Sequence, residues 1–279
     1  MVESGITKAK LGDFKAAISD FNRAIVFDSS EVEPYFNRGI VFSELKDYQA
    51  AISDFTKVIR LKPMYPEPYY NRALAKDYLG DHQSAISDYI KAISLKADYP
   101  EAYYNLGLAR FDLGAYNEAQ NDFTRAIQYR PVFAEAFYNR GLCRFQMKDY
   151  QTAIRDFSEA IRMDTSVSDY FSSRGAAKAA AGDFEDALAD FSITISMNPE
   201  TLNPRMNKAL ALMYLKRYPE ALAEYDQIIG LFPEEAEAFT KRGVARQYNG
   251  DNKGACEDWK EASLMNSEKS KEYLLKFCQ

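Results

Sequence analysis

One asparagine recurs at a fixed position along the chain, and its side chain is suited to holding a polypeptide backbone. The recurring residues are Asn37, Asn71, Asn105, Asn139 and Asn207. The first four are 34 residues apart, and the last follows after twice that interval. A carboxamide has two N–H donors and an acceptor oxygen, so it can bond the C=O and N–H groups of an extended peptide without reading its side chains. These five residues, the asparagine ladder, are therefore candidate peptide-binding residues.

Tyrosines accompany the ladder and would add an apolar wall with a polar tip. Tyr70, Tyr104 and Tyr138 directly precede three of the asparagines, and we include them in the candidate site. The ladder is interrupted by Ser173 and replaced by Lys241. A structural alternative stays open, in which asparagine is a tolerated helix residue of a duplicated unit and bonds between neighbouring repeats.

Residues that catalysis or metal binding would need are scarce. His82 is the only histidine, and it stands where other repeats mostly carry an aromatic residue, which favours a packing role. Cys143, Cys256 and Cys278 lack zinc or redox spacing, and three free thiols are compatible with a reducing compartment. The carboxylates follow the repeat, and no phosphate loop or dinucleotide fingerprint is present. We expect no enzymatic activity, no catalytic residue, no metal site and no cofactor.

The elements that must position the ladder repeat with the same period, which is typical of helix-turn-helix arrays. An alanine recurs at Ala17, Ala51, Ala85, Ala119, Ala153, Ala187, Ala221 and Ala255. An aromatic residue follows it in every repeat, at Phe21, Phe55, Tyr89, Phe123, Phe157, Phe191, Tyr225 and Trp259. A small residue on the preceding helix marks a close approach of two helices, at Gly5, Gly39, Ala73, Gly107, Gly141, Gly175, Ala209 and Gly243. Glycines such as Gly114 should end the first helix of a pair, and aspartates such as Asp47 and Asp183 should cap the second.

On these residues the chain resembles the tetratricopeptide repeat (TPR) family, as a bacterial-type array of many repeats, over nearly its whole length. Arg205 replaces the opening aromatic of one repeat, without putting the fold in doubt. The resemblance implies an all-α, right-handed superhelical solenoid of helix-turn-helix pairs, whose first helices line a concave groove. In family members the ladder position lies on this inner face, and similar asparagine ladders there hold ligands. We therefore predict an interaction scaffold or adaptor that binds an extended polypeptide segment in the groove.

We expect a single solenoid over residues 1–279, closed by a capping helix at about 268–277. The predicted repeats are 1–31, 32–65, 66–99, 100–133, 134–167, 168–201, 202–235 and 236–269. Met1 falls where Tyr35 and Tyr69 open their repeats, which suggests a segment excised from a longer protein. The alternative function follows from this start: a structural or self-associating module of a larger protein or machine, such as a secretion assembly or an enzyme with a separate catalytic domain.

Charged residues also follow the period. Arginines recur on the first helices at Arg38, Arg72, Arg140, Arg174 and Arg242, with Lys208 in register and Leu106 as a gap. Acids recur on the second helices at Asp20, Asp54, Asp88, Asp122, Asp156, Asp190, Glu224 and Asp258. The opposite signs predict structural ion pairs between helices, individually weak if exposed, with a basic binding stripe as the minority alternative. Acids in the first turns of the first helices, such as Glu67, interact favourably with the helix dipole. Their negative charge would repel the C-terminal carboxylates of heat-shock proteins, so we do not expect these as ligands.

Net charge and hydropathy limit the partners. The formal charge is −6 and the isoelectric point about 5.1, so the chain repels phosphate backbones. No apolar run approaches the roughly 18 residues that cross a bilayer. We expect a protein or peptide partner, no nucleic acid and no direct membrane insertion, and we leave homo-oligomer formation open. A cytoplasmic location is expected, although the start at Met1 keeps an exported or periplasmic parent protein open.

Overall fold

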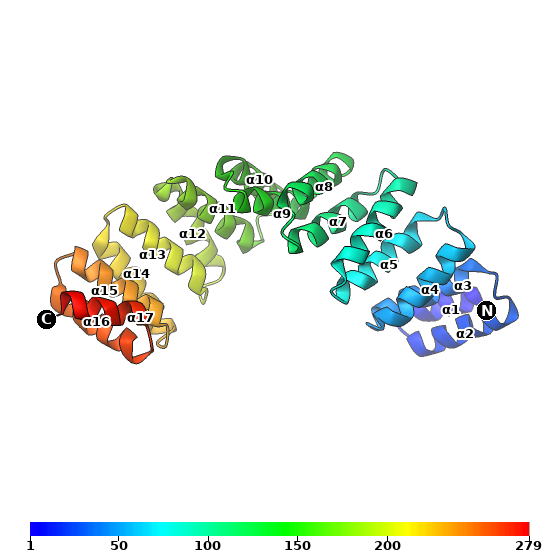
Figure 1. Ribbon diagram of the computed structural model, residues 1–279, viewed down its shortest axis with the longest axis horizontal. Coiled ribbons are helices and arrows are strands. Elements are labelled where there is room, and N and C mark those ends of the chain that lie inside the picture. The colour runs from blue at the N-terminus through cyan, green and yellow to red at the C-terminus, as the bar shows by residue number, and fades with distance from the viewer. Residues whose placement is uncertain (279) are drawn as a thin grey trace. The chain divides into compact units, whose positions relative to one another are not determined.

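The computed structural model describes residues 1–278, which fold into helices joined by short turns (Figure 1). The chain divides into two compact units, Met1–Cys143 and Arg144–Gln279. The helices of the first unit are α1 (Val2–Lys10), α2 (Phe14–Phe27), α3 (Val32–Glu44), α4 (Tyr48–Leu61), α5 (Pro66–Tyr78), α6 (His82–Leu95), α7 (Pro100–Asp112), α8 (Tyr116–Tyr129) and most of α9 (Ala134–Gln146). Those of the second are α10 (Tyr150–Met163), α11 (Ser168–Ala181), α12 (Phe184–Met197), α13 (Leu202–Tyr214), α14 (Tyr218–Leu231), α15 (Ala236–Tyr248), α16 (Asn252–Leu264) and α17 (Glu268–Phe277).

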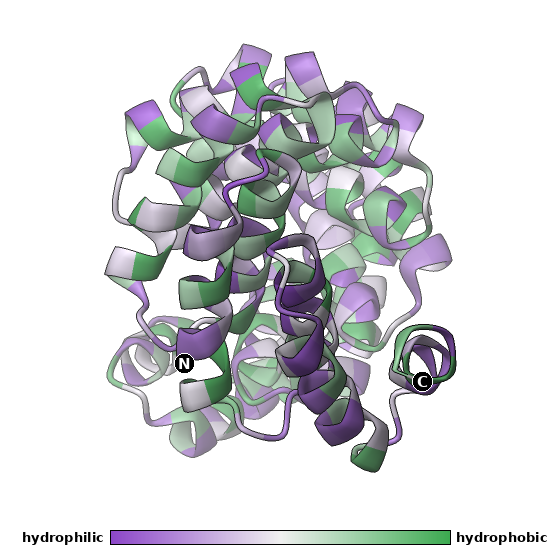
Figure 2. Cartoon of the chain, turned by 90° about the vertical axis from the view of Figure 1, so that its left-hand side faces the viewer, coloured by the Kyte–Doolittle hydropathy of each residue, from purple (hydrophilic) through white to green (hydrophobic). Residues whose placement is uncertain are grey.

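The described helices form an all-α repeat solenoid of helix pairs. In the first unit α1, α3, α5 and α7 each pack against the next helix along the chain, and in the second unit α11, α13 and α15 do the same. We call the odd-numbered members A helices and the even-numbered members B helices. Hydrophobic and hydrophilic residues alternate around these helices (Figure 2), because each must bury one face and expose the other. Within residues 1–278, no helix is both long and apolar enough to cross a membrane.

The turn inside each pair has a common chemistry. Gly114 follows the end of α7 with a φ of 74°, a left-handed conformation that glycine adopts without a steric cost. Lys46 occupies the equivalent position after α3, with a φ of 61°. The Asp47 carboxylate accepts a hydrogen bond of 3.1 Å from the Ala50 N–H at the start of α4. The predicted glycine and aspartate signals are thus confirmed here. Asp183 is an exception, because its side chain makes no capping bond at the start of α12.

The core of each pair is an aromatic side chain of the B helix against a small residue of the A helix. Phe123 is fully buried, and a Cβ atom added to Gly107 would lie only 2.7 Å from its Cε1. Glycine at this position therefore allows α7 and α8 to approach closely. The two pairs that carry alanine instead of glycine are the two in which the aromatic residue is tyrosine, Ala73 with Tyr89 and Ala209 with Tyr225.

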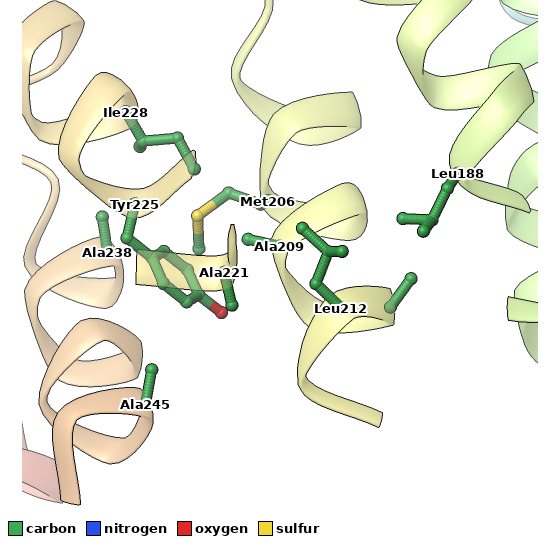
Figure 3. Packing of buried hydrophobic residues seen from close by; sticks show 10 residues of the cluster. Leu188, Met206, Ala209, Leu212, Ala221, Tyr225, Ile228, Ala238 and Ala245 are labelled. Carbon is green, nitrogen blue, oxygen red and sulfur yellow. The ribbon is translucent and has the colours of Figure 1, made fainter. Parts of the chain in front are cut away.

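One core cluster of the second unit shows how neighbouring pairs share this packing. Tyr225 of α14 lies beside Ala209, Ala221 and Met206 (Figure 3). Ala238 of α15 belongs to the same cluster. The aromatic residue thus contacts its own A helix and the next pair, so that burial is completed only by stacking.

The predicted ion pairs are confirmed and are more buried than expected. Arg72 donates to both carboxylate oxygens of Asp88, at 2.8 and 2.7 Å, and also to the Thr56 hydroxyl on the preceding B helix at 3.0 Å. The same two-pronged contact joins Arg174 to Asp190, which is only 1% exposed. These pairs join α5 to α6 and α11 to α12. Loss of one partner should cost far more than at an exposed pair, because the other charge stays buried.

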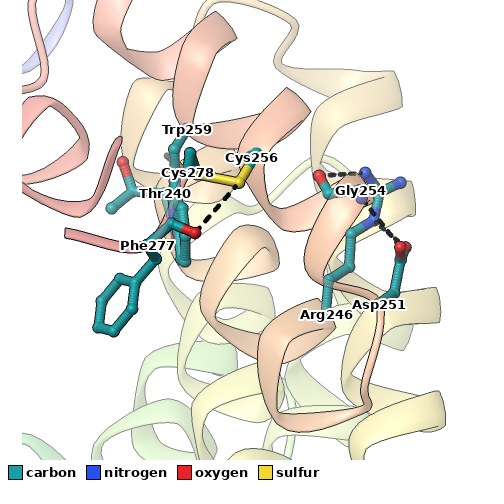
Figure 4. The surroundings of a disulfide bond; sticks show 8 residues. All are labelled: Thr240, Arg246, Asp251, Gly254, Cys256, Trp259, Phe277 and Cys278. Atoms are coloured by element: carbon teal, nitrogen blue, oxygen red, sulfur yellow. Dashed lines mark hydrogen bonds and ion pairs between the residues drawn. A yellow bond between two sulfur atoms is a disulfide. The ribbon is translucent and has the colours of Figure 1, made fainter. Parts of the chain in front are cut away.

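The C-terminal helix α17 covers the last pair, as predicted. Its Tyr273 and Phe277 rings lie 5.0 and 5.7 Å from the Trp259 ring of α16. A disulfide joins Cys256 to Cys278, with the Cα atoms 5.8 Å apart (Figure 4). The expectation of three free thiols is therefore wrong. Spacing in the sequence did not show this pair, because packing of α17 on α16 brings together two cysteines that are 22 residues apart.

Candidate functional site

The asparagine ladder lies on the A helices, with each side chain partly buried. In the first unit Asn37, Asn71, Asn105 and Asn139 occupy the same position on α3, α5, α7 and α9. Asn207 has this position on α13 of the second unit. The regular placement follows from the repeat, because each asparagine lies two positions before the glycine or alanine of its A helix. Gly39 and Gly107 face the aromatic residues of their B helices.

The amide N–H groups of the first four asparagines are used inside the protein. The Nδ2 atom of Asn71 donates to the Glu67 carbonyl one turn earlier, at 2.8 Å, and Asn37 bonds its helix in the same way. Asn105 and Asn139 each make this bond and a second one, to the tyrosine hydroxyl of the preceding A helix. The Nδ2 to hydroxyl distances are 3.0 Å for Asn105 with Tyr70, and 3.1 Å for Asn139 with Tyr104. The donors of Asn105 and Asn139 therefore link neighbouring repeats, as the structural alternative expects.

The tyrosines of the candidate site are also engaged in packing. The Tyr70 ring lies 4.9 Å from that of Tyr99, and the Tyr104 ring lies 4.8 Å from that of Phe133. Burial raises the pKa of both Tyr70 and Tyr104, so their hydroxyls stay neutral and can accept the asparagine N–H. Tyr138 is partly buried at the same position on α9. The Tyr70 and Tyr104 rings thus contribute to packing within the array as well as to the surface of the A helices.

The acceptor side of the ladder is unused. Among the described residues, the Oδ1 atoms of Asn37, Asn71, Asn105 and Asn139 accept no hydrogen bond. Asn207 makes no hydrogen bond with any part of the chain from residue 1 to 278, through either its donors or its acceptor. An extended peptide could therefore donate its backbone N–H groups to the ladder without breaking an internal bond.

A pocket opens between consecutive A helices at three equivalent places, and each has a ladder asparagine in its lining. The pocket between α1 and α3 includes Asn37 and has a volume of about 360 Å³. The pocket between α3 and α5 includes Asn71 and has a volume of about 330 Å³. The pocket between α11 and α13 includes Asn207 and has a volume of about 690 Å³. Apolar depressions beside a few polar groups are the usual form of a binding surface.

His82 belongs to a small polar cluster that joins α5 to α6. Its Nδ1 atom lies 3.0 Å from an Asp77 carboxylate oxygen, and the Tyr89 hydroxyl donates to the other oxygen at 2.7 Å. Burial raises the pKa of Asp77, with the two hydrogen bonds acting in the opposite direction. Within residues 1–278, no three His, Cys, Asp or Glu side chains are grouped to hold a metal ion.

The sequence reasoning missed the pockets, although it found the asparagines beside them. The prediction used only the positions that carry the same residue type in every repeat. The size of each pocket depends instead on positions where the residue differs between repeats. The available signal was the run Ala179–Ala180–Ala181 in α11, where other A helices carry larger side chains.

Family models match most of the repeats in this architecture. A tetratricopeptide repeat model matches residues 104–167, 173–236 and 206–263, and a second model of that description matches 32–64. A third, described as TPR repeat, matches 78–114. The chain belongs to the tetratricopeptide repeat family. No curated protein sequence matches this TPR chain significantly.

Solved structures share the TPR fold. A crystal structure of MamA is 27% identical with a TM-score of 0.56, and the match covers 58% of this chain and 94% of MamA. YrrB, described as a TPR protein with an unusual peptide-binding site, is 21% identical with a TM-score of 0.61, over 70% of this chain and 97% of YrrB. The C-terminal part of a TPR protein from Cytophaga hutchinsonii is 19% identical with a TM-score of 0.70, over 85% of this chain and 98% of its own.

Proposed function

We propose that this TPR chain is a non-enzymatic scaffold or adaptor that binds an extended polypeptide segment along its A helices. The observation that carries the proposal is the repeated pocket between consecutive A helices, each with a ladder asparagine whose acceptor oxygen is unpaired. A peptide backbone would donate N–H groups to the Oδ1 atoms, while its side chains enter the pockets. YrrB is an example of this fold with a peptide-binding site.

The proposal differs from the initial interpretation of the ladder in one respect. Asn105 and Asn139 donate to Tyr70 and Tyr104, so those N–H groups are not available to a ligand. The ladder would act mainly as a row of acceptors. Asn207, which has no internal partner among the described residues, could act through both its donors and its acceptor.

Asn207→Ala is the variant that tests the site most cleanly. It removes no internal hydrogen bond, so the free energy of unfolding should change by less than about 0.5 kcal/mol. Peptides selected from a random phage-displayed library with the unmodified chain should bind this variant about 5- to 10-fold more weakly, the effect of one hydrogen bond. Fluorescence anisotropy with the labelled peptides measures the loss.

Two further variants separate binding from stability. Asn117→Ala changes an exposed asparagine on the B helix α8 and should alter neither property. Asn139→Ala removes two internal bonds and should lower the free energy of unfolding by about 0.5 to 1.5 kcal/mol for each. Failure to enrich any peptide, or equal affinity of Asn207→Ala and Asn117→Ala for every selected peptide, would contradict the proposed site.

The self-associating alternative makes a different prediction in solution. A structural module that stacks on itself should increase in mass with concentration, whereas an adaptor with an open surface should sediment as a monomer. Sedimentation velocity over a 100-fold range of concentration, about 1 to 100 μM, covers the range in which weak self-association is detected. A monomer throughout this range would remove support from the alternative.

The disulfide bears on the compartment in which the scaffold would act. Disulfides persist in oxidising compartments and are rare in the cytosol. The Cys256–Cys278 bond therefore favours the exported parent protein over the cytoplasmic location. Alkylation of thiols in intact cells, followed by mass spectrometry, should find Cys256 and Cys278 protected. Alkylation of both in their native compartment would instead support the cytoplasm.

A further inference from the structure

The pocket between α11 and α13 differs from its two equivalents in size. Its volume of about 690 Å³ is roughly twice the 360 and 330 Å³ of the pockets beside Asn37 and Asn71. All three lie between the same faces of consecutive A helices. The A helices α11 and α13 are adjacent in the second unit (Figure 1).

Substitutions confined to α11 explain the additional volume. Ala176 stands where α5, α9 and α13 carry leucine, and Ala180 stands where α5, α13 and α15 carry tyrosine. Ala179 replaces the phenylalanine of α7 and α9. All three alanines line the pocket, so the side chains that would fill it in other repeats are missing here. The pocket is therefore specific to this repeat.

The lining of this pocket is uncharged and partly aromatic. No described residue that lines it is charged, whereas Lys10 and Glu44 line the pocket beside Asn37, and Glu44 and Lys46 line the pocket beside Asn71. One wall is a stacked pair, Phe184 and Tyr214, with ring centroids 4.7 Å apart and planes inclined by 9°. A charged side chain would lose its hydration here without gaining a partner.

The polar group of the pocket is suited to a peptide backbone. Asn207 lies in the lining and makes no hydrogen bond within residues 1–278. It can therefore bond the backbone N–H and C=O beside an inserted side chain. An aromatic ring complements the uncharged lining, fills more of the volume than an aliphatic side chain, and can contact the edge or face of the Phe184–Tyr214 pair.

We propose that the pocket between α11 and α13 receives one aromatic side chain of the bound polypeptide and determines which segments the chain selects. The inference rests on the proposed function, because it specifies the ligand of the same A-helix surface. The Phe184–Tyr214 wall and the alanines of α11 recognise the ring, and Asn207 holds the backbone next to it. The two smaller pockets, with charged residues at their edges, do not accept a ring in this way.

The test is a variant that fills the pocket with the side chains of neighbouring repeats. Ala176→Leu together with Ala180→Tyr introduces residues that occur at these positions in α13, so the fold tolerates them. Ala189→Leu is the matched control, because it adds an apolar side chain at an exposed position of α12. Circular dichroism and thermal unfolding of both variants confirm that they are folded.

The probes are the N-acetyl amides of phenylalanine, tryptophan, leucine, lysine and glutamate. Their binding is measured by two-dimensional ¹H–¹⁵N NMR spectra of the ¹⁵N-labelled chain. The aromatic amides should shift the resonances of Ala179, Asn207 and Tyr214, which line the pocket and are unchanged in the filled variant, and the lysine and glutamate amides should not. The filled variant should lose these shifts, whereas Ala189→Leu should keep them. Peptides selected from the phage library should share an aromatic residue and bind the filled variant at least about tenfold more weakly.

The outcomes distinguish this inference from the proposed function. Selected peptides that depend on Asn207, lack a common aromatic residue and bind the filled variant normally would overturn the aromatic pocket and leave peptide binding intact. Absence of any selected peptide, with no shift from the aromatic amides, would overturn both. Aromatic amides that shift the pocket resonances equally in the filled variant would also refute the inference, because the ring would then bind elsewhere.

Discussion

Asp122 on α8 is a buried carboxylate in the repeat where leucine replaces the recurring arginine of the A helices. It is 6% exposed, and its ion-pair partner is Arg110, at 2.7 Å. Leu106 stands where Arg72 and Arg174 make two-pronged contacts with the equivalent aspartates. Burial therefore raises the pKa of Asp122 to about 6, although Arg110 acts in the opposite direction. The ordinary value is 3.8.

The sign of the resulting pH dependence follows from linkage. The folded protein binds a proton at Asp122 more tightly than the unfolded chain does, so protonation favours the folded state. This contribution is fully present below the unfolded pKa of 3.8 and is lost as the pH rises through about 6. A pKa difference of about 2, at 1.36 kcal/mol per pKa unit, corresponds to about 3 kcal/mol.

The perturbation is Asp122→Asn, which cannot ionise. The free energy of unfolding of the unmodified chain, relative to that of this variant, should fall by about 2 to 2.5 kcal/mol between pH 4 and pH 7, because the contribution is not yet complete at pH 4. Urea unfolding at several pH values measures this difference, and pH effects of other groups cancel between the two proteins. A ¹³C NMR titration of the Asp122 carboxyl group gives the pKa directly.

Restoring the missing arginine provides a second test of the same reasoning. Leu106→Arg should lower the pKa of Asp122, because a guanidinium would then contact the carboxylate as in the neighbouring repeats. The reasoning is refuted if the Asp122 carboxyl group of the unmodified chain titrates below pH 4.5, or if the stability curves of the unmodified chain and Asp122→Asn run parallel.

Two further predictions concern packing and the C-terminal cap. Gly107→Ala should lower the free energy of unfolding by about 1 to 3 kcal/mol, because its Cβ would crowd Phe123, whereas Gly230→Ala, with open space around it, should raise stability by about 0.5 to 1 kcal/mol. Adding Phe123→Tyr to Gly107→Ala should recover part of the lost stability, since alanine and tyrosine occur together in two other repeats. Urea unfolding of the unmodified chain, the two glycine variants and the double variant checks both expectations. Reduction of the Cys256–Cys278 disulfide, which spans 22 residues, should destabilise the closed cap by about 3 kcal/mol and accelerate hydrogen exchange in α17. The control is the variant Cys256→Ser with Cys278→Ser, which has no disulfide to reduce. The stabilising role of the disulfide would be contradicted if a reductant left hydrogen exchange in α17 unchanged, or altered it equally in this variant.

The candidate site was predictable only in part. The period placed Asn37, Asn71, Asn105, Asn139 and Asn207 on the A helices, because a repeated sequence must repeat its local structure. It did not show that Asn105 and Asn139 donate to tyrosines of the preceding repeat, since that contact depends on the stacking of neighbouring A helices. Whether the ladder binds a ligand stays a prediction, and so does the division of the chain into one solenoid of eight repeats.

The sequence by itself determined the all-α repeat solenoid and the family, because alanine, glycine and aromatic residues at a fixed period leave one way to bury each helix. Tertiary structure decided what three departures from the period lead to. Arg205 replaces an aromatic residue by reaching Glu224 at 3.1 Å and the Pro199 carbonyl at 2.9 Å. Cys256 meets Cys278, and α11 leaves a large pocket beside Asn207. Each depends on distances between elements, which a local pattern of residues does not contain.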